Sequence, residues 1–465
     1  MRISALLAPD IRRILEEDPE QVRELLEEIH PEDLADIVSE LEPDHAALLL
    51  ARMPAEGAAP IFERLEEHEQ EEVAEQMKPE SVALIASEMA PDDRADLFSL
   101  LPPGMAEDVL SNLQRVDPEA AEEMREIAQY AETAAGHLMT TWYVTGRPSD
   151  SIHVAFEAVR SHAELTDTPI YNIYALSDDG RLIGIVSLRE LIIAAKTGEE
   201  QPIDPLLHRN FISVPPDMDQ EEVARRMAKY DINAMPVVDN GGVLLGIITI
   251  DDIVDVLTAA QTEDVQKIGG MEPLDVPYFK TTFAAFIRKR GVWLLALFIS
   301  EFFTQTALRH YDNVLSAIHG AAYYVPLLVS AGGNSGSQSS TLIIRGLATG
   351  EVKLRDWWRI AWRELGMGIV LGLGLATIGF FRVLMYPEQH AAFALTVAIA
   401  LVGIVVAGCT VGAMLPILLR RLGVDPATSS TPFIASLIDV TGILIFVNVA
   451  QIIMADVITK FDVVH

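Results

Sequence analysis

Two acidic residues stand inside long apolar runs of the chain. Asp439 lies in PFIASLIDVTGILIFVNVA, residues 432–450, and no base stands one helical turn away. A carboxylate at membrane depth costs roughly 3 kcal/mol or more unless it faces water or a cation. Asp439 therefore indicates a cation site, with a protonated structural carboxyl and a proton-relay group as alternatives. Glu301, in LFISEFFTQTAL, either lines an outer vestibule or bonds Gln305 one turn later.

A belt of small and polar residues crosses another apolar run, PLLVSAGGNSGSQSSTLIIRG, residues 326–346. Its glycines, Gly332, Gly333 and Gly336, permit helices to approach closely. Lipid cannot satisfy the polar side chains of the belt, so they must face other helices or water. These side chains are Asn334, Ser335, Ser337, Gln338, Ser339 and Ser340. Hydrogen bonding between helices and the lining of a pore are both open as their role.

The apolar runs that hold these residues predict a membrane domain. Each is long enough for a span of about 20 residues; they cover 292–308, 314–344, 364–386, 391–419 and 430–456. Bases cluster before the first run, between the second and third, and between the fourth and fifth, whereas the other two loops carry only Arg309 and Arg382. Because cytosolic loops are enriched in Lys and Arg, this pattern predicts five spans with the N-terminus inside and the C-terminus outside.

The charge of the chain is confined to the part before these runs. From Val292 onward acids and bases balance at ten each, so all of the net charge of −34 precedes that residue. This acidic half should repel nucleic acid and attract cations. A need for solubility alone would also explain the excess of acids. The single cysteine, Cys409, excludes an intrachain disulfide. The start, MRISALLAPDIRR, has no apolar core of signal-peptide length, so the acidic half is expected in the cytosol.

The first 130 residues have a helical pattern that repeats about every dozen residues between Pro31 and Leu113. The units are PEDLADIVSEL, EPDHAALLLARM, PAEGAAPIFERL, KPESVALIASEM, APDDRADLFSLL and PPGMAEDVLSNL. Proline and acids near the start of each unit suit a first helical turn. Helices this short cannot bury a face alone, so we expect them to stack into a small superhelix. A scaffold or partner-docking surface is the alternative role.

Residues 137–200 and 203–258 carry one pattern twice. Each copy has an apolar strand, a turn at Asp-Asp-Gly or Asp-Asn-Gly-Gly, a second strand, and a helix that begins after Ser187 or Thr249. The doubled pattern resembles a tandem pair of CBS modules, which implies a ligand sensor that restrains an attached domain. VDVLTAAQTEDVQKIGG then continues as helix toward the membrane, either to transmit movement or as a passive tether.

Across nearly its full length the chain resembles the MgtE family of Mg²⁺ channels. The resemblance is carried by the helical repeat, the paired modules, the connecting helix, and the stretches PLLVSAGGNSGSQSSTLIIRGLATGEV and LLRRLGVDPATSSTPFIASLIDVTGILIF. It implies a multidomain fold and a homodimer with one central pore. The expected parts are an all-α superhelical domain at 1–136, α+β CBS modules at 137–200 and 201–258, a connecting helix and linker at 259–290, and a five-span membrane domain at 291–465.

The resemblance also implies pore residues. Asp439 matches the pore carboxylate of the family, Ala435 a position whose backbone carbonyl faces the ion, and Thr431 a position where some relatives have Asn. Mg²⁺ prefers octahedral oxygen and keeps much of its water, so few carboxylates and several neutral oxygens suit it. Ca²⁺ should fit less well, whereas Co²⁺, Ni²⁺ and Mn²⁺ are harder to exclude.

Regulatory carboxylates follow from the same resemblance. In the family, acids between the helical domain, the CBS pair and the connecting helix bind Mg²⁺ and hold the pore shut. The matching positions are Asp92, Asp93, Asp96, Asp219, Glu221, Asp231, Asp252, Asp255, Glu263 and Asp264; acids of some relatives are replaced by Pro60 and Ala260. CBS pairs often bind adenine nucleotides, which makes Arg189 and Glu190 candidates for ATP.

These observations predict a Mg²⁺ channel in the cytoplasmic (inner) membrane, embedded in the lipid bilayer. Mg²⁺ would be both its cargo and the regulator that closes it. The alternatives are a CBS-regulated secondary transporter of divalent cations and a membrane-anchored Mg²⁺ or nucleotide sensor without transport. The sequence holds no clustered His/Cys metal site, phosphate loop or nucleophile elbow, so neither an enzyme nor a nucleic-acid partner is expected.

Overall fold

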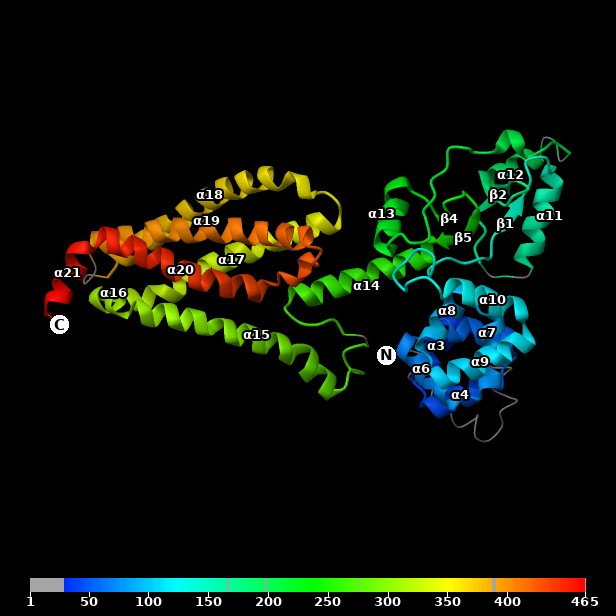
Figure 1. The fold of residues 1–465 in the computed structure, drawn as a ribbon, viewed down its shortest axis with the longest axis horizontal. Helices are drawn as coiled ribbons and strands as arrows, with labels where there is room; N and C mark the ends of the chain where they lie inside the picture. Colours follow the sequence, from blue (N-terminus) through cyan, green and yellow to red (C-terminus); the bar gives the residue numbers. More distant parts are fainter. Residues whose placement is uncertain are drawn as a thin grey trace. The chain divides into compact units, whose positions relative to one another are not determined.

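The computed structural model describes residues 29–464 except 165, 167, 197, 199, 275 and 387–389. The chain divides into two compact units, residues 1–258 and 259–465. Helix α14 (Ile250–Ile268) begins in the first and ends in the second. Figure 1 shows the elements of each unit. Residues 1–28 of the expected N-terminal domain lie outside the described residues.

Short helices stacked in two rows form the N-terminal part of the first unit. In the described residues they are α3 (Pro31–Ser39), α4 (Pro43–Leu50), α5 (Ala55–Phe62), α6 (Glu67–Gln76), α7 (Pro79–Glu88), α8 (Pro91–Leu100), α9 (Pro103–Val116) and α10 (Pro118–Ile127). Each odd-numbered helix packs on the next odd one and each even-numbered helix on the next even one. Leu50, Phe62 and Leu113 are fully buried between them. The expected superhelix is therefore present.

Two small α/β modules follow. The first has β1 (Val144–Gly146), α11 (Ile152–Ala163), β2 (Asn172–Leu176), β3 (Leu182–Ser187) and α12 (Leu188–Ala195); the second has η1 (Asp204–Leu206), α13 (Gln220–Tyr230), β4 (Ala234–Val238) and β5 (Leu244–Thr249). β1 pairs parallel with β2, and β2–β3 and β4–β5 are antiparallel hairpins. Ser187 caps α12 by accepting a bond from the Glu190 amide.

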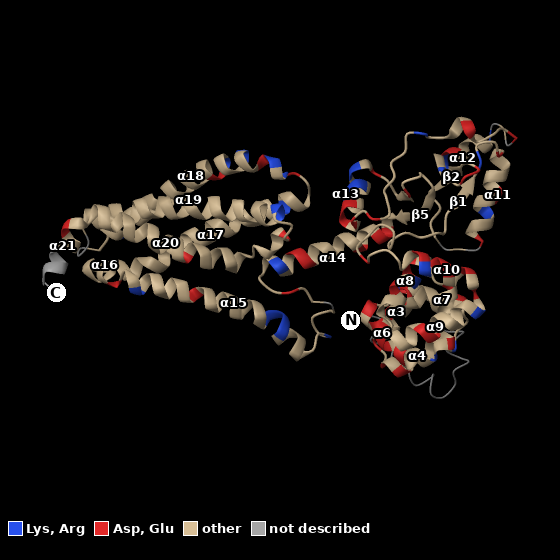
Figure 2. Ribbon diagram, viewed as in Figure 1, with Lys and Arg blue, Asp and Glu red and all other residues tan. Residues whose placement is uncertain are grey.

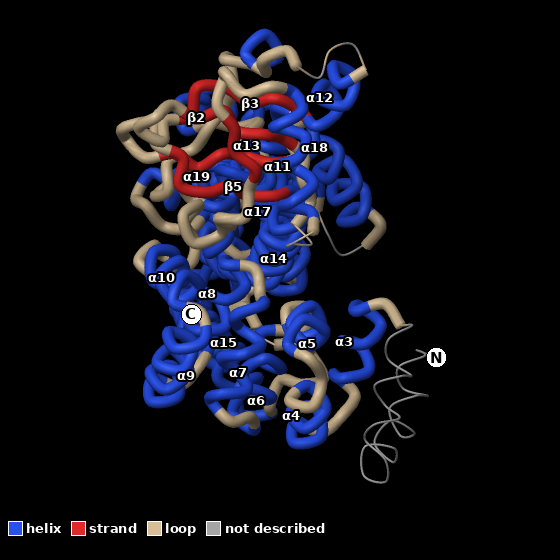
Figure 3. Tube along the Cα trace, turned by 90° about the vertical axis from the view of Figure 1, so that its right-hand side faces the viewer, coloured by secondary structure: helices blue, strands red, loops and turns tan. Residues whose placement is uncertain are grey.

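The two hairpins meet at their turns, where glycine supplies the backbone conformation. Gly180 and Gly242 have φ values of 77° and 81°, which only glycine adopts readily. The amide of Leu182 donates to the Gly242 carbonyl at 3.0 Å, and that of Leu244 to the Gly180 carbonyl at 3.2 Å. The strands of both modules therefore lie close together, as Figure 3 shows.

The core of the second module is continuous with the N-terminal helices. Ala95 on α8 and Ile127 on α10 are fully buried in the same hydrophobic cluster as Val223 and Ile248 of the module. The first module has a separate core around Ile173, Val186 and Leu191. The second module is thus the one that the acidic helices contact through their core.

Long helices make up the second unit. They are α15 (Phe283–His310), α17 (Ala321–Ala348), α18 (Trp357–Leu384), α19 (Ala391–Arg421) and α20 (Thr431–Ile453), with the shorter α16 (Asp312–Ala317), η2 (Leu354–Asp356), η3 (Pro426–Thr428) and α21 (Ala455–Val464). Among the described residues, four helices are long and apolar enough to cross a membrane: α15, η2 joined to α18, α19 and α20. α17 is 28 residues long but carries the polar belt.

Glycines let α17 and α19 touch backbone to backbone. A methyl group added at Gly408 would lie 2.3 Å from the carbonyl oxygen of Gly332, and one at Gly412 would lie 2.1 Å from that of Gly336. Cys409, beside the first of these contacts, is buried. Figure 2 shows Asp and Glu gathered on the helices of the first unit, whereas α17, α19 and α20 are almost free of charge.

Candidate functional site

Thr431, Ala435 and Asp439 lie on one stripe of α20, because helical residues four apart share a face. All three are half-buried in the single chain. Thr431 is the first residue of the helix and Pro432 the second. Proline favours this position, because the amide of a first-turn residue has no partner within the helix. The residues that the sequence assigns to the ion path are therefore aligned along this helix.

The serines of the polar belt bond to the chain around this stripe. Ser337 Oγ donates to the Thr431 carbonyl at 3.4 Å, and Ser340 Oγ to the Ser429 carbonyl at 3.5 Å. A methyl added at Gly333 would lie 3.5 Å from Ala435. Ser337 and Ser340 thus bond between segments, whereas Ser335 bonds the Ala331 carbonyl within α17, and Asn334 and Gln338 are exposed in the single chain.

The structure brings together part of the expected regulatory set. Asp92 is buried at the start of α8, and its Oδ1 has no hydrogen-bond partner among the described residues. Burial and the nearby Asp252 raise its pKa well above the usual range. Burial and Asp92 do the same to the pKa of Asp93. On α14, burial is the main cause that raises the pKa of Asp252 to about 6. Close carboxylates that resist ionisation are a setting in which a divalent cation would be favourable.

Asp96 and Asp255 border this cluster. Asp96 Oδ1 lies 2.8 Å from Nε2 of the buried His137. Burial, Asp251 and Glu32 raise the pKa of Asp255. In the described residues, no three His, Cys, Asp or Glu side chains are arranged so that they could hold a metal ion. The carboxylates are neighbours, and a cation would have to draw them together.

Several of the remaining expected ligands have local partners. Asp219 caps α13 by accepting from the Glu221 and Glu222 amides, and Glu221 pairs with Arg225 one turn later. Asp231 ends α13 with φ 56°. Glu263 pairs with Lys267 on α14, and Asp264 is the next residue after Glu263.

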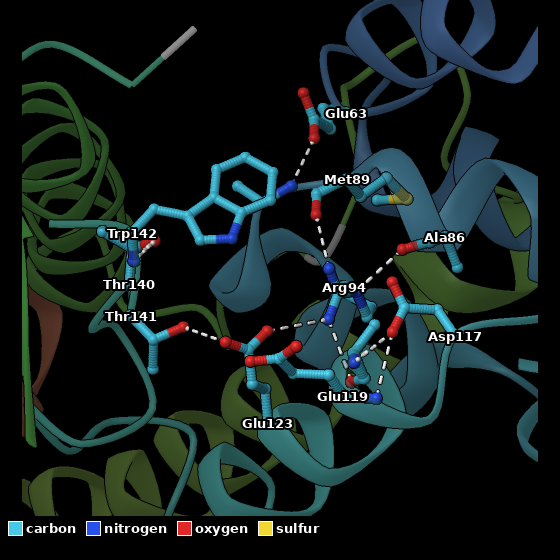
Figure 4. Close-up of polar contacts among 12 residues, drawn as sticks. Glu63, Ala86, Met89, Arg94, Asp117, Glu119, Glu123, Thr140, Thr141 and Trp142 are labelled. Carbon is cyan, nitrogen blue, oxygen red and sulfur yellow. Dashed lines mark hydrogen bonds and ion pairs between the residues drawn. The ribbon is translucent and has the colours of Figure 1, made fainter. Parts of the chain in front are cut away.

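Arg94 holds this region together and was not expected from the sequence (Figure 4). Its side chain is 1% exposed. It donates to the carbonyls of Ala86, Met89 and Ala120 at 2.7–2.9 Å, and to Glu123 at 3.4 Å. These bonds tie the end of α7 and the start of α10 to α8, which begins with the acidic pair at 92 and 93.

Glu123 extends the network out of the helical repeat. Thr141 Oγ1 donates to Glu123 Oε1 at 2.8 Å. The neighbouring Thr140 exchanges two backbone bonds with Ile247 on β5, at 2.8 and 2.9 Å. The acidic helix α8 is thereby connected to the strand that leads into α14 and Asp252.

A sequence signal for Arg94 exists in the repeat. It lies three residues after the proline that begins its helix, where other helices have Leu34, Ala46 and Val82, and all of these are buried. Comparison of the units therefore marks the arginine as a core residue.

In the second unit, the end of the connecting helix contacts the start of α20. Lys267 pairs with Glu263 and, at 2.5 Å, with Asp425, which caps η3 before α20. Gly270 has φ 75°, and an added methyl would lie 2.8 Å from Trp293 Nε1 and 3.2 Å from Pro432. Glycine is therefore favoured at position 270, because a side chain there would be strained and would meet the indole of Trp293.

The CBS pair encloses a cavity of about 1180 Å³. Its lining includes Tyr171, Asn172, Arg189, His208, Asp231 and Asn233. Of the two nucleotide candidates, Arg189 lines the cavity, whereas Glu190 accepts bonds from Ser187 and His208.

Comparisons with known proteins agree with this architecture. A family model described as a divalent cation transporter, MgtE, matches residues 325–449; models of the MgtE intracellular N domain and of the CBS domain match 29–133, and 135–196 and 203–259. The magnesium transporter MgtE of Thermus thermophilus is 42% identical over 339 residues, 73% of this chain and 74% of that protein. The chain belongs to the MgtE family.

Other members are more distant from this MgtE chain. The magnesium transporter MgtE of Enterococcus faecalis is 30% identical, over 72% of each chain. A crystal structure of the soluble part of a magnesium transporter is 28% identical with a TM-score of 0.50, and covers 55% of this chain and 98% of that one. The cytosolic domain of the Mg²⁺ channel MgtE in complex with ATP is 36% identical with a TM-score of 0.49, and covers 54% and 100%.

The expected resemblance and fold class are therefore confirmed. The chain has a helical N-terminal domain, a CBS pair and a helical membrane region, in that order. MgtE is a family of magnesium transporters, which places the chain among membrane transport proteins rather than among enzymes.

Proposed function

We propose that this magnesium transporter is a channel, in which Mg²⁺ passes along the α20 stripe of two copies of the chain. The observation that carries the proposal is the alignment of Thr431, Ala435 and Asp439 on one face of α20 beside the belt of α17. In the described residues, no base forms an ion pair with Asp439, so its charge is available to a cation. A homodimer would supply two carboxylates across its axis.

The stripe suits an ion that keeps its water. One carboxylate per chain, a hydroxyl and backbone carbonyls can hydrogen-bond to a hydrated Mg²⁺ without replacing its whole shell. Co²⁺, Ni²⁺ and Mn²⁺, which also accept octahedral oxygen, are expected competitors. Five spans follow if α17 crosses the membrane with the four apolar helices. The first unit would then face the cytosol, and the C-terminus would lie outside.

Flux into liposomes tests the ion path. Asp439→Ala should abolish Mg²⁺ uptake by the reconstituted chain, because the hydrated ion loses its only carboxylate on the stripe. The control is Asp456→Asn, which changes an exposed acid on α21 beyond the pore helix. Uptake that survives Asp439→Ala would overturn the proposal, and uptake that follows an imposed proton gradient would favour a coupled transporter.

We further propose that cytosolic Mg²⁺ closes the channel by binding between α8 and α14. The crowding of Asp92, Asp93 and Asp252 supports this, because their repulsion is relieved when a divalent cation bridges them. Asp219, Glu221, Asp231, Glu263 and Asp264 would join only after movement or in the dimer. This arrangement would make channel closure depend on the Mg²⁺ concentration in the cytosol.

Single-channel recording with stepped cytosolic Mg²⁺ tests the closure. The double variant Asp92→Asn, Asp252→Asn should raise the Mg²⁺ concentration that closes the channel. Asp108→Asn, on the exposed face of α9, is the matched control and should behave as the parent chain. A closing concentration that is the same in all three chains would rule out this site.

Nucleotide binding is a second candidate function, favoured by the cavity of the CBS pair. The cavity offers Arg189 for phosphate and aromatic and amide groups for a base. Titration calorimetry with ATP should give binding that Arg189→Ala weakens. If titration of ATP into the parent chain produced no heat of binding, nucleotide binding would be contradicted.

A further inference from the structure

Glu301 is an intramembrane carboxylate outside the region that the divalent cation transporter model matches, residues 325–449. It lies on α15, in a helix long and apolar enough to span a membrane. α15 packs directly against α20, the helix with the proposed ion stripe. That family model therefore does not cover Glu301.

The contact between the two helices is a hydrogen bond to this carboxylate. Ser436 Oγ donates to Glu301 Oε1 at 3.0 Å. Ser436 is buried and lies on α20 between Ala435 and Asp439. In the described part of the chain Glu301 is bonded to this serine and not to Gln305, so the expectation of a bond within α15 gives way to a bond between helices.

Ser436 lies three residues before Asp439 on α20, so its bond places Glu301 about one helical turn from Asp439. Within the described residues, neither carboxylate has an ion pair with Lys, Arg or His. A serine hydroxyl satisfies one oxygen of Glu301 but leaves its charge uncompensated. A carboxylate in such a position is stable only where a cation or water is near.

We propose that Glu301 is a specificity-determining residue of the ion path, a second carboxylate that acts on the cation at Asp439 through its charge. The proposal rests on the proposed path along α20. Ser436 fixes the distance of this charge from the path, because it ties Glu301 to the turn that precedes Asp439. Coulomb energy scales with the charge of the ion, so each added carboxylate attracts a divalent cation about twice as strongly as a monovalent one and widens the difference between them. Glu301 therefore favours Mg²⁺ over K⁺ or Na⁺.

Three variants separate charge from tether. Glu301→Gln keeps an oxygen that can accept from Ser436 but removes the charge. Ser436→Ala keeps the charge but removes the bond. Glu301→Ala removes both. Thr306→Val is the control for any polar loss on α15, because Thr306 is exposed and its hydroxyl donates to the Phe302 carbonyl of the same helix.

The readouts are the half-saturating Mg²⁺ concentration and the Mg²⁺-to-K⁺ permeability ratio of the full chain in liposomes. Glu301→Gln and Glu301→Ala should both raise the first by about fivefold and lower the second. Ser436→Ala should change both less than Glu301→Gln does.

If Glu301 were only a structural tie, Glu301→Gln would match the parent while Ser436→Ala and Glu301→Ala would be impaired together, and the proposal would fall. Asp439→Asn tells this failure from that of the path itself. If Asp439→Asn loses flux while Glu301→Gln behaves as the parent chain, only the role of Glu301 is contradicted. If flux survives Asp439→Asn, the proposed ion path along α20 is contradicted, and so is this inference.

Discussion

At the scale of single residues, the buried guanidinium of Arg94 orders the acidic helices. Arg94 is enclosed by three carbonyls and by Glu123. It therefore satisfies the end of α7, whose carbonyls would otherwise be buried without donors. The charge of Arg94 alone suggests an exposed side chain, whereas its position in the repeat matches buried residues and the structure buries it.

Replacing Arg94 by Met should destabilise the first unit by about 3 kcal/mol, because Glu123 and the three carbonyls lose their donor. Thermal unfolding of the full chain in detergent measures this. Arg125→Met is the control, since Arg125 pairs with Glu122 at the surface and such pairs contribute little. Equal melting temperatures for the two variants would show that the guanidinium is dispensable.

The crowded carboxylates predict an unusual response to pH. Asp252 has a pKa of about 6 in the fold, above its ordinary value of 3.8, and burial also raises the pKa of Asp92 well above its usual range. The folded state thus binds protons more tightly than the unfolded state, so stability should rise as pH falls through 6 and level off below 4. Without Mg²⁺, the first unit should melt higher at pH 5 than at pH 7.5.

Mg²⁺ should reverse this order by stabilising the ionised carboxylates mainly at pH 7.5. Melting temperatures at both pH values, with and without Mg²⁺, give the comparison. Asp252→Asn should flatten the pH dependence, since it removes one of the groups that titrate. A parent chain whose stability falls steadily from pH 7.5 to pH 5 would contradict the assignment.

At the scale of elements, α14 carries the acidic site at its start and the contact with α20 at its end. Gly270 follows the helix and sits against Trp293 and Pro432. Lys267 adds an ion pair to Asp425. The helix is therefore anchored at the base of the proposed ion path.

Gly270→Ala should loosen this anchor, because a left-handed conformation costs alanine about 1 kcal/mol and the added methyl meets the indole. We expect the Mg²⁺ concentration that closes the channel to rise while the open-channel flux is kept. Gly374→Ala on α18, where a methyl meets nothing within 4 Å, is the matched control. Closure unchanged by Gly270→Ala would argue for a passive tether.

Most elements could be predicted from the sequence, since prolines start the short helices and turns at Gly180 and Gly242 close the hairpins. The apolar run at 314–344 is longer than one span requires, and the structure divides it at Gly320, with φ 80°, into α16 and α17. The bond from Ser436 to Glu301 could not be predicted, because it depends on how α15 and α20 pack. The Asp92–Asp252 proximity likewise depends on distant parts of the chain and came only from the family resemblance.

At the scale of the whole molecule, the segregation of charge distinguishes the two units. Chelation of Mg²⁺ should let the acids of the first unit repel and expose the segment between α10 and β1, residues 128–143. Limited proteolysis read by mass spectrometry should show faster cleavage there in EDTA than in Mg²⁺. NaCl at equal ionic strength should protect less, because it screens charges without bridging them. Equal cleavage rates in Mg²⁺ and in NaCl would show that the protection comes from charge screening and not from Mg²⁺ bridging the acids.

The single cysteine has a practical consequence. Cys409 is 2% exposed on α19, beside a backbone contact that excludes even a methyl group, so a maleimide has no access to it in the folded chain. Spin labels or fluorophores can therefore be attached to the otherwise native sequence at introduced thiols alone. Asp108→Cys on α9 and Val254→Cys on α14, both exposed positions of the first unit, would form a molecular ruler across the acidic cluster.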